Sequence, residues 1–383
     1  MPRSDDIEYI PGIDHLRACA PVLIVIYHSE QLISRKVAPS ATLSWPVSRN
    51  PFMAIVHEGH TAVALFIVLN GFIFTYGSIG ENVHYLEFLR NRVLRIYPLM
   101  MMMIMIGISV FPEKFTISAF ICTVLPFQNM RIALQLGQYT NMFWTIAVEF
   151  QFYLIFPFLN RTLLTKGYTA LLRILVITML SRVSGVLHGG NPRDFSYWTI
   201  LGRLDQFVIG MLAACIIKIF KIENRRLQWA MPVGGTGLLV ALLIFNSLGG
   251  WIVITPWKII WPPIEASMWG LIIIGYLSFI HTKENFLLRV ISSIGTISYS
   301  MYLTHWAVLQ TVLNHSMFFV TPNNVYLGSF LSAVLIVLPL TIIVSSLTYH
   351  IIEKSFLELR QSYLEPIPVQ QIITNDFIVN PQP

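Results

Sequence analysis

Long apolar stretches separated by short polar segments recur along almost the whole chain. Because an α-helix rises about 1.5 Å per residue, about 20 apolar residues are needed to cross a bilayer. A shorter apolar stretch, 115–127, is interrupted near Pro126 and is a candidate re-entrant segment packed among its neighbours. Stretches near the spanning length predict ten membrane helices, at 18–33, 60–79, 96–111, 143–160, 168–187, 199–219, 229–248, 263–281, 294–315 and 325–350.

The composition supports a membrane protein and excludes other classes. Hydrophobic residues make up 55% of the chain and charged residues only 11%, whereas soluble domains carry about 25% charged residues. Three cysteines in 383 residues are too few for a disulfide framework, and the apolar runs argue against disorder. We therefore expect an all-α fold, a polytopic integral membrane helical bundle of about ten transmembrane helices plus the candidate re-entrant segment.

The net charge of +6 is interpreted as a sign of how the chain is oriented in the membrane. If the N-terminus is cytoplasmic and 115–127 does not cross, 15 of the 25 basic residues fall on the cytoplasmic side and seven in outer loops. A crossing at 115–127 would largely remove this bias, so we predict that both termini are cytoplasmic, and we expect no nucleic-acid partner. The expected organisation is a cytoplasmic segment at 1–17, a membrane domain at 18–356 and a polar, disordered cytoplasmic tail at 357–383.

Ionisable residues at membrane depth are costly, so each is a candidate functional residue. Arg17 and His28 are eleven residues apart, about three helical turns, and therefore share one face of the first span. An arginine at the cytoplasmic entrance suits a phosphate-bearing ligand, and a histidine within the membrane suits proton transfer. A snorkelling arginine and a hydrogen-bonded core histidine fit the same spacing, which leaves both interpretations open.

A second candidate group follows Trp144 in the span at 143–160. Glu149 and Tyr153 are four residues apart and share a helical face. A glutamate within a spanning helix must be protonated or partnered. Catalysis and a structural ion pair with a core arginine such as Arg17 are equally compatible with this pattern.

Arg92 and Arg95 stand three residues apart where the span at 96–111 begins, so both can point to one side of the helix. They could bind a diphosphate, and they could equally anchor the helix to anionic lipid head groups, which is the commoner reason for such a run.

Two further polar groups lie near or within spans. Arg203 and Asp205 open the span at 199–219 near the outer face, where a local salt bridge is the simple interpretation. Ser298, Tyr302 and His305 form a polar stripe on an apolar helix, a pattern that also serves helix–helix hydrogen bonding.

The remaining histidines are weaker candidates for functional residues. His57 and His60 fall in the first outer loop without a credible carboxylate or cysteine ligand set, and no zinc-type spacing is present, so we expect no metal site. The sequence also has no GxGxxG, P-loop or GxSxG motif.

Taken in order, these motifs resemble the membrane-bound acyltransferase 3 family of sugar O-acyltransferases over nearly the whole chain. Asn70, Thr145 and Ser355 depart from the family's usual residues, and Asn70 puts any role of a serine hydroxyl there in doubt. The matching elements are Arg17 with His28, Phe66 to Phe72, Arg92-x-x-Arg95-Ile96-x-Pro98, Trp144 to Glu149 with Phe152 and Tyr153, Ser298-Tyr299-Ser300-x-Tyr302-x-x-His305, and Glu353-Lys354-Ser355-Phe356.

The resemblance implies transfer of an acyl group, with acetyl expected, from acyl-CoA to a hydroxyl of a surface polysaccharide or another sugar acceptor. It implies acetyl-CoA as a donor substrate and no tightly bound cofactor. Catalysis is expected at His28 and Glu149, with Glu149 orienting His28; direct transfer and a covalent acyl-histidine both remain open. The expected acyl-CoA-binding residues are Arg17, Arg92 and Arg95, and the expected substrate-binding residues are Trp144, Tyr153, Arg203, Asp205, Tyr302 and His305.

The resemblance also implies a multi-pass protein of the bacterial inner membrane, in contact with acyl-CoA, a carbohydrate acceptor and membrane lipids. No hydrolase-like segment follows the last span, so any partner enzyme is expected to be a separate chain. The alternative is a proton-coupled secondary transporter that uses His28 and Glu149 as a relay. A third interpretation is a scaffold subunit whose polar residues only join helices.

Overall fold

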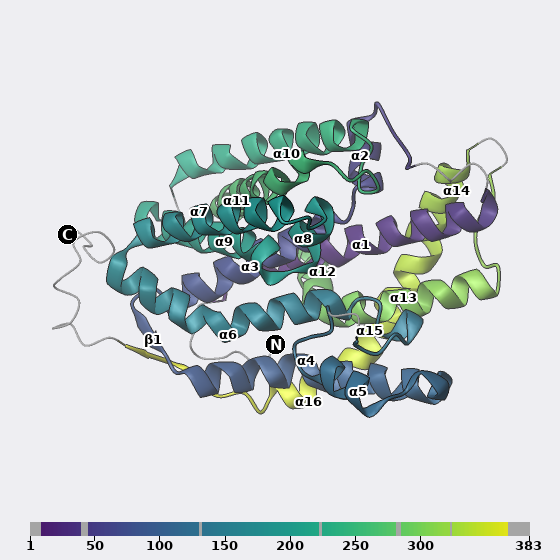
Figure 1. Ribbon diagram of the computed structural model, residues 1–383, viewed down its shortest axis with the longest axis horizontal. Coiled ribbons are helices and arrows are strands. Elements are labelled where there is room, and N and C mark those ends of the chain that lie inside the picture. Colours follow the sequence, from purple (N-terminus) through teal and green to yellow (C-terminus); the bar gives the residue numbers. More distant parts are fainter. Residues whose placement is uncertain are drawn as a thin grey trace.

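The computed structural model describes residues 9–39, 45–129, 132–221, 224–280, 285–321 and 324–366. These residues form an all-α membrane bundle, in which most long helices run roughly along its longest axis (Figure 1). The helices are α1 (Pro11–Val37), α2 (Pro51–His57), α3 (Thr61–Ser78), α4 (Tyr85–Val110), α5 (Ile117–Val124), α6 (Phe143–Lys166), α7 (Tyr168–Leu187), α8 (Pro192–Trp198), α9 (Ile200–Phe220), α10 (Ala230–Ser247), α11 (Trp261–Ile280), α12 (Phe286–Thr296), α13 (Ser298–Asn314), α14 (Val325–Ser332), α15 (Leu338–Thr348) and α16 (Lys354–Leu357).

Short 3-10 and π segments extend or connect these helices. The 3-10 segments are η1 (Pro112–Lys114), η2 (Gly137–Tyr139), η3 (Arg225–Trp229) and η4 (Pro256–Ile260), and the π segments are η5 (Ala333–Val337) and η6 (Tyr349–Glu353). The two π segments join α14, α15 and α16 into one helical run of 33 residues.

The predicted spans correspond closely to long helices. Among the described residues, eight helices are long and apolar enough to cross a membrane, or nine if the bent pair α12 and α13 is one span. The first predicted span, 18–33, corresponds to α1, which is 27 residues long but carries Asp14, Arg17 and Glu30 and is not among these nine. The multi-pass, all-α membrane architecture is confirmed, and α1 added to these nine would give the ten helices expected from the sequence.

The stretch at 115–127 does not form a spanning helix. Its helical part, α5, has eight residues and is therefore about 12 Å long, well short of the hydrocarbon core. The chain then turns back, and Gln151 in α6 donates a hydrogen bond of 2.7 Å to the carbonyl of Pro126. The arrangement agrees with a segment that packs against its neighbours without crossing.

Close packing of α3 against α9 forms the centre of the bundle. A side chain at Gly71 would collide with the backbone of Phe207, and one at Gly210 would collide with the backbone of Val68. Both glycines therefore allow the two helix backbones to approach each other, as small residues commonly do in membrane bundles. Beside this crossing, the rings of Phe152 in α6 and Phe207 in α9 stack with their centroids 3.7 Å apart.

The chain returns to one end of the bundle after its last helix. Strand β2 (Leu364–Pro366) pairs antiparallel with β1 (Glu81–Val83), which lies just before α4 (Figure 1). Asn91 in α4 exchanges two hydrogen bonds with the backbone of Gln361. The first residues of the predicted polar tail are thus packed against α4, whereas 367–383 lie outside the described residues.

Candidate functional site

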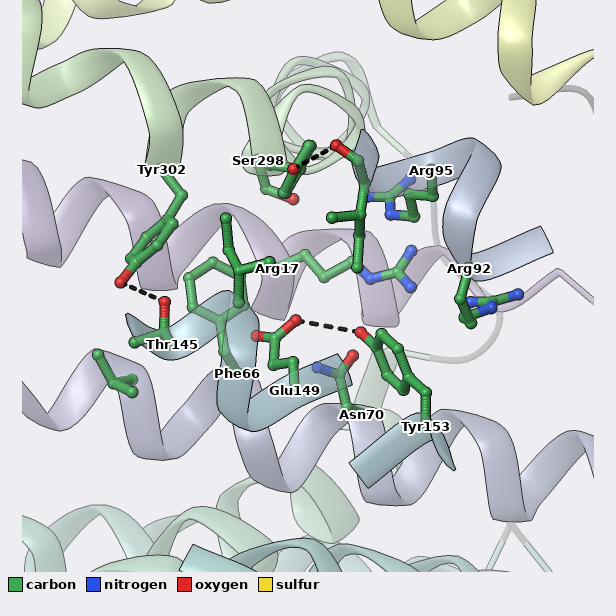
Figure 2. A pocket seen from close by; sticks show the side chains of 14 residues that line it. Arg17, Phe66, Asn70, Arg92, Arg95, Thr145, Glu149, Tyr153, Ser298 and Tyr302 are labelled. Carbon is green, nitrogen blue, oxygen red and sulfur yellow. Dashed lines mark hydrogen bonds between the residues drawn. The ribbon is translucent and has the colours of Figure 1, made fainter. Parts of the chain in front are cut away.

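The first cavity of interest lies between α1, α3, α4, α6 and α13 (Figure 2). Its empty volume is about 700 Å³, a value that includes the part open to solvent. It is called the arginine cavity below, and its lining residues are Arg17, Val63, Phe66, Asn70, Arg92, Arg95, Ile96, Thr145, Ile146, Glu149, Tyr153, Ser298, Tyr299 and Tyr302.

The three predicted acyl-CoA-binding arginines line this cavity together and lie on the same side of it in Figure 2. Arg17 forms a 3.2 Å ion pair with Asp14, one turn before it in α1. The guanidinium of Arg92 lies 4.8 Å from the ring centre of Phe74, which fixes its plane. Within the described part of the chain, Arg92 Nε has no hydrogen-bond acceptor, so one donor of this site is unused.

A fourth arginine, Arg360, lies near the same group and was not predicted from the sequence. It follows the last helix, and its Nε donates to the carbonyl of Leu357 at 3.1 Å. Burial, together with the charge of the neighbouring Arg95 and then of Arg92 and Arg17, lowers the pKa of Arg360 to about 10. This end of the cavity is therefore electropositive.

Glu149 lines the same cavity, where the positive charges of Arg95 and Arg17 act on its carboxylate. Tyr153 donates a 3.0 Å hydrogen bond to Glu149 Oε2, which confirms that the two residues share a helical face (Figure 2). The side chain of Asn70 in α3 also hydrogen-bonds Glu149. The polar group that replaces the family's usual serine thus contacts the glutamate directly.

His28 has a different partner from the expected one. Its Nδ1 lies 3.0 Å from Nε2 of His305 in α13, and the two rings are nearly parallel, with an 8° angle between their planes. Because Glu149 hydrogen-bonds Tyr153 and Asn70 and lines the arginine cavity, the expectation that Glu149 orients His28 does not match this geometry.

A second cavity surrounds His28 and is called the aromatic cavity below. Its volume is about 670 Å³ including the part open to solvent. Four tryptophans, three tyrosines and two histidines form most of its wall. Its lining residues are Ile24, Tyr27, His28, His60, Val63, Asn141, Met142, Trp144, Tyr197, Trp198, Trp251, Tyr302 and Trp306.

The two cavities meet at Val63 and Tyr302, which line both of them. Each of three helices lines both cavities, at different positions along its length, and one residue pair in each helix illustrates this. In α1 these are Arg17 and His28, in α6 Tyr153 and Trp144, and in α13 Ser298 and Trp306, naming the residue of the arginine cavity first. The predicted topology places the first residue of each pair toward the cytoplasm, so the cavities follow one another along the direction of the spans.

The predicted substrate residues Arg203 and Asp205 lie behind the cavity walls. Asp205 is fully buried and forms a 2.5 Å ion pair with Arg182 in α7. The guanidinium of Arg203 lies 3.9 Å from the ring centre of Tyr197 and donates to Gln206 at 2.9 Å. Arg203 therefore touches a residue of the aromatic cavity, and Asp205 joins α9 to α7.

His57 and His60 each lie beside one buried carboxylate, which the sequence alone did not indicate. His57 lies 2.6 Å from Glu30, and His60 Nε2 lies 3.0 Å from Glu58. Among the described residues, no group of three or more histidine, cysteine, aspartate or glutamate side chains is placed to hold a metal ion.

Sequence reasoning missed most of the aromatic cavity. Tyr197, Trp198 and Trp251 lie in loops or short helices between spans, where the apolar periodicity carries no signal. Tyr27, directly before His28, and Trp306, directly after His305, could have been found from their positions beside recognised motifs.

Comparison with known proteins places the chain in a family. A family profile described as an acyltransferase domain, acyltransferase 3, matches residues 10–350. The chain belongs to the acyltransferase 3 family. The resemblance inferred from the ordered motifs is therefore confirmed over nearly the whole described bundle.

Several named proteins of Staphylococcus aureus are also similar to the chain. The chain is 25% identical over 378 residues to O-acetyltransferase OatA of Staphylococcus aureus strain NCTC 8325 / PS 47, and the same values hold for OatA of strains COL and MRSA252. The match covers 90% of this chain but 57% of each relative, so the chain spans little more than half of their length. No solved structure matches the chain significantly.

Proposed function

We propose that this acyltransferase 3 protein transfers an acyl group, acetyl in the first instance, from acyl-CoA to a hydroxyl group of a carbohydrate. The observation that carries the proposal is the meeting of two cavities, one lined by arginines and one containing His28, at Val63 and Tyr302. The O-acetyltransferase names of the relatives support the same reaction class.

The arginine cavity is the proposed donor site. Guanidinium groups hold phosphate oxygens through paired N–H donors, and Arg17, Arg92 and Arg95 present three such groups at one end of the cavity. The unused Nε of Arg92 offers a donor for an incoming phosphate. With the phosphates held there, the pantetheine arm would extend past Glu149 and place the thioester near Tyr302.

The aromatic cavity is the proposed acceptor site. Trp144, Trp251 and Trp306 offer flat apolar faces, and Tyr302 and His28 offer polar groups beside them. Such a combination suits a sugar, whose C–H faces pack on aromatic rings while its hydroxyl groups need hydrogen-bond partners. A purely apolar acceptor would leave these polar groups without a partner.

The proposed chemistry is direct transfer. His28 Nε2 takes the proton of the acceptor hydroxyl while its oxygen forms a bond to the thioester carbonyl carbon. The carbon–sulfur bond then breaks, and the departing CoA thiolate receives the proton from His28, so atoms and charge balance. The hydroxyl of Tyr302 would donate to the oxyanion at the junction of the cavities.

The proposed location is a bacterial inner membrane with both chain ends in the cytoplasm. The excess of basic residues on that side supports this orientation, and it places the arginine cavity where acyl-CoA is available. The acceptor would then reach the aromatic cavity from the outer half of the membrane.

The test uses purified protein in nanodiscs with acetyl-CoA labelled in the acetyl group and surface carbohydrate as acceptor. Label that appears on the carbohydrate supports the enzyme. Movement of a solute across vesicles without labelled product would favour the proton-coupled transporter instead, and absence of both would favour a scaffold. The transporter alternative is weakened by the separate hydrogen-bond partners of His28 and Glu149, which leave no direct relay between them.

A further inference from the structure

The two nitrogens of the His28 ring have unequal surroundings. Nδ1 lies 3.0 Å from Nε2 of His305, whereas Nε2 has no hydrogen-bond partner among the described residues. A neutral imidazole carries one proton, so it can act as a base only through the nitrogen that lacks it. Whether Nε2 is that nitrogen depends on which atom donates in the bond to His305.

The surroundings of His305 decide the direction of this bond. His305 Nδ1 lies 2.7 Å from the carbonyl oxygen of Tyr302 and 3.1 Å from that of Met301. Carbonyl oxygens only accept hydrogen bonds, so His305 Nδ1 must carry the proton. In the neutral ring its Nε2 is then bare and must accept, which makes His28 Nδ1 the donor.

We infer that His305 is a positioning residue that holds His28 in the tautomer with a proton on Nδ1 and a bare Nε2 facing the acceptor. The proton order runs from His28 Nδ1 to His305 Nε2 and from His305 Nδ1 to the backbone of α13. The carbonyl oxygens of Met301 and Tyr302 can only accept hydrogen bonds, so the fold fixes the direction of both hydrogen bonds.

Packing fixes the ring plane as well as the tautomer. The His28 ring lies edge-on to Trp306, with centroids 4.7 Å apart, and Tyr27 contacts it at 5.0 Å. His305 is fully buried, so water does not compete for its Nε2. The base is therefore held in one orientation before substrate arrives.

His305 holds the tautomer and orientation of His28 without a net charge, as the buried carboxylate of a Ser-His-Asp triad does for its histidine. When His28 takes the acceptor proton, its Nδ1–H still donates to the lone pair of His305. A neutral imidazole avoids the cost of placing an isolated carboxylate at membrane depth. Among the described residues, the hydrogen-bond partner of His28 Nδ1 is accordingly a histidine and not a carboxylate.

This inference rests on the proposed function for its meaning, but the tautomer can be measured without turnover. Nitrogen NMR of protein labelled at histidine, in nanodiscs, distinguishes a protonated from a bare ring nitrogen. The His28 signals are assigned by their loss in His28→Gln. We expect wild-type His28 to show a protonated Nδ1 and a bare Nε2. The opposite tautomer in the folded wild type overturns the inference, whatever the activity.

Three variants separate a tautomer effect from a general structural one. His305→Leu removes the acceptor, whereas His305→Gln supplies a carboxamide oxygen near the position of Nε2. His315→Gln, at the exposed end of α13, is the matched control. We expect His305→Leu to lower kcat by about 10²-fold and to mix the His28 tautomers, with the KM for acetyl-CoA unchanged.

His305→Gln should keep the tautomer and most of the turnover, and His315→Gln should change neither. An unchanged His28 tautomer in folded His305→Leu would overturn the inference. Correct tautomer signals in a protein with no acyl transfer would instead contradict the proposed function and leave the positioning role intact.

Discussion

The hydroxyl groups of Thr145 and Tyr302 lie 2.7 Å apart at the junction of the two cavities. Thr145 in α6 lines the arginine cavity, and Tyr302 in α13 lines both. Both side chains are buried, so this hydrogen bond fixes the Tyr302 hydroxyl where a thioester carbonyl would reach the acceptor.

Tyr302→Phe should therefore lower turnover more than substrate binding. Removing one donor to a developing oxyanion costs on the order of 10²-fold in kcat. We predict this loss with little change in the KM for acetyl-CoA, measured from initial rates of labelled product. Tyr85→Phe, which removes a hydrogen bond to Leu154 away from both cavities, is the control. Equal losses in the two variants would argue against an oxyanion role.

Arg92→Gln should weaken the donor site. The substitution removes a guanidinium held against Phe74 but keeps a polar side chain, so we predict a KM for acetyl-CoA raised by about 10-fold. Acetyl-pantetheine lacks the nucleotide phosphates and should be affected far less. Arg161→Gln, at an exposed position in α6, is the matched control. An equal effect on both donors would show that Arg92 acts on something other than phosphate.

Trp251→Ala should weaken acceptor binding without affecting the donor. Trp251 contacts Tyr197 at 4.1 Å, and its carbonyl accepts a 3.0 Å hydrogen bond from Lys258, so the backbone stays anchored when the ring is removed. We predict a rise of about 10-fold in the acceptor KM, measured at saturating acetyl-CoA. Trp229→Ala, on an exposed tryptophan, should leave both KM values unchanged.

Asp205→Asn tests the buried ion pair with Arg182. Loss of one partner leaves an uncompensated buried charge, which costs about 3–5 kcal/mol. We predict a clearly lower midpoint temperature of thermal unfolding in nanodiscs for Asp205→Asn. The double variant Arg182→Met, Asp205→Leu should recover most of the lost midpoint temperature, because it leaves no buried charge. A variant of normal stability with a raised acceptor KM would instead support the substrate role expected from the sequence.

The spans and the local pairs were predictable because they depend on neighbouring residues. Apolar runs indicated α3, α6 and α9, and the i, i+4 spacing of Glu149 and Tyr153 predicted their contact. The 70° bend between α12 and α13 was not predicted, because the apolar stretch continues through Ile297 without a proline.

The contacts between distant segments could not be predicted in the same way. His28 and His305 are 277 residues apart, and helical spacing within α1 says nothing about which helix packs beside it. The shared face of Arg17 and His28 was a correct deduction from helix geometry. Arg17 and His28 nevertheless line separate cavities, because Val63 and Tyr302 lie between those cavities. This separation depends on how α3 and α13 pack, which helix geometry within α1 does not determine.

The most direct test of His28 as the base between donor and acceptor compares wild-type protein with His28→Gln in nanodiscs. Transfer of labelled acetyl to carbohydrate and equilibrium binding of CoA are measured on the same preparations, with His315→Gln as control. We predict that His28→Gln loses turnover by at least about 10²-fold while the Kd for CoA stays unchanged. Turnover retained in a folded His28→Gln protein would contradict the assignment.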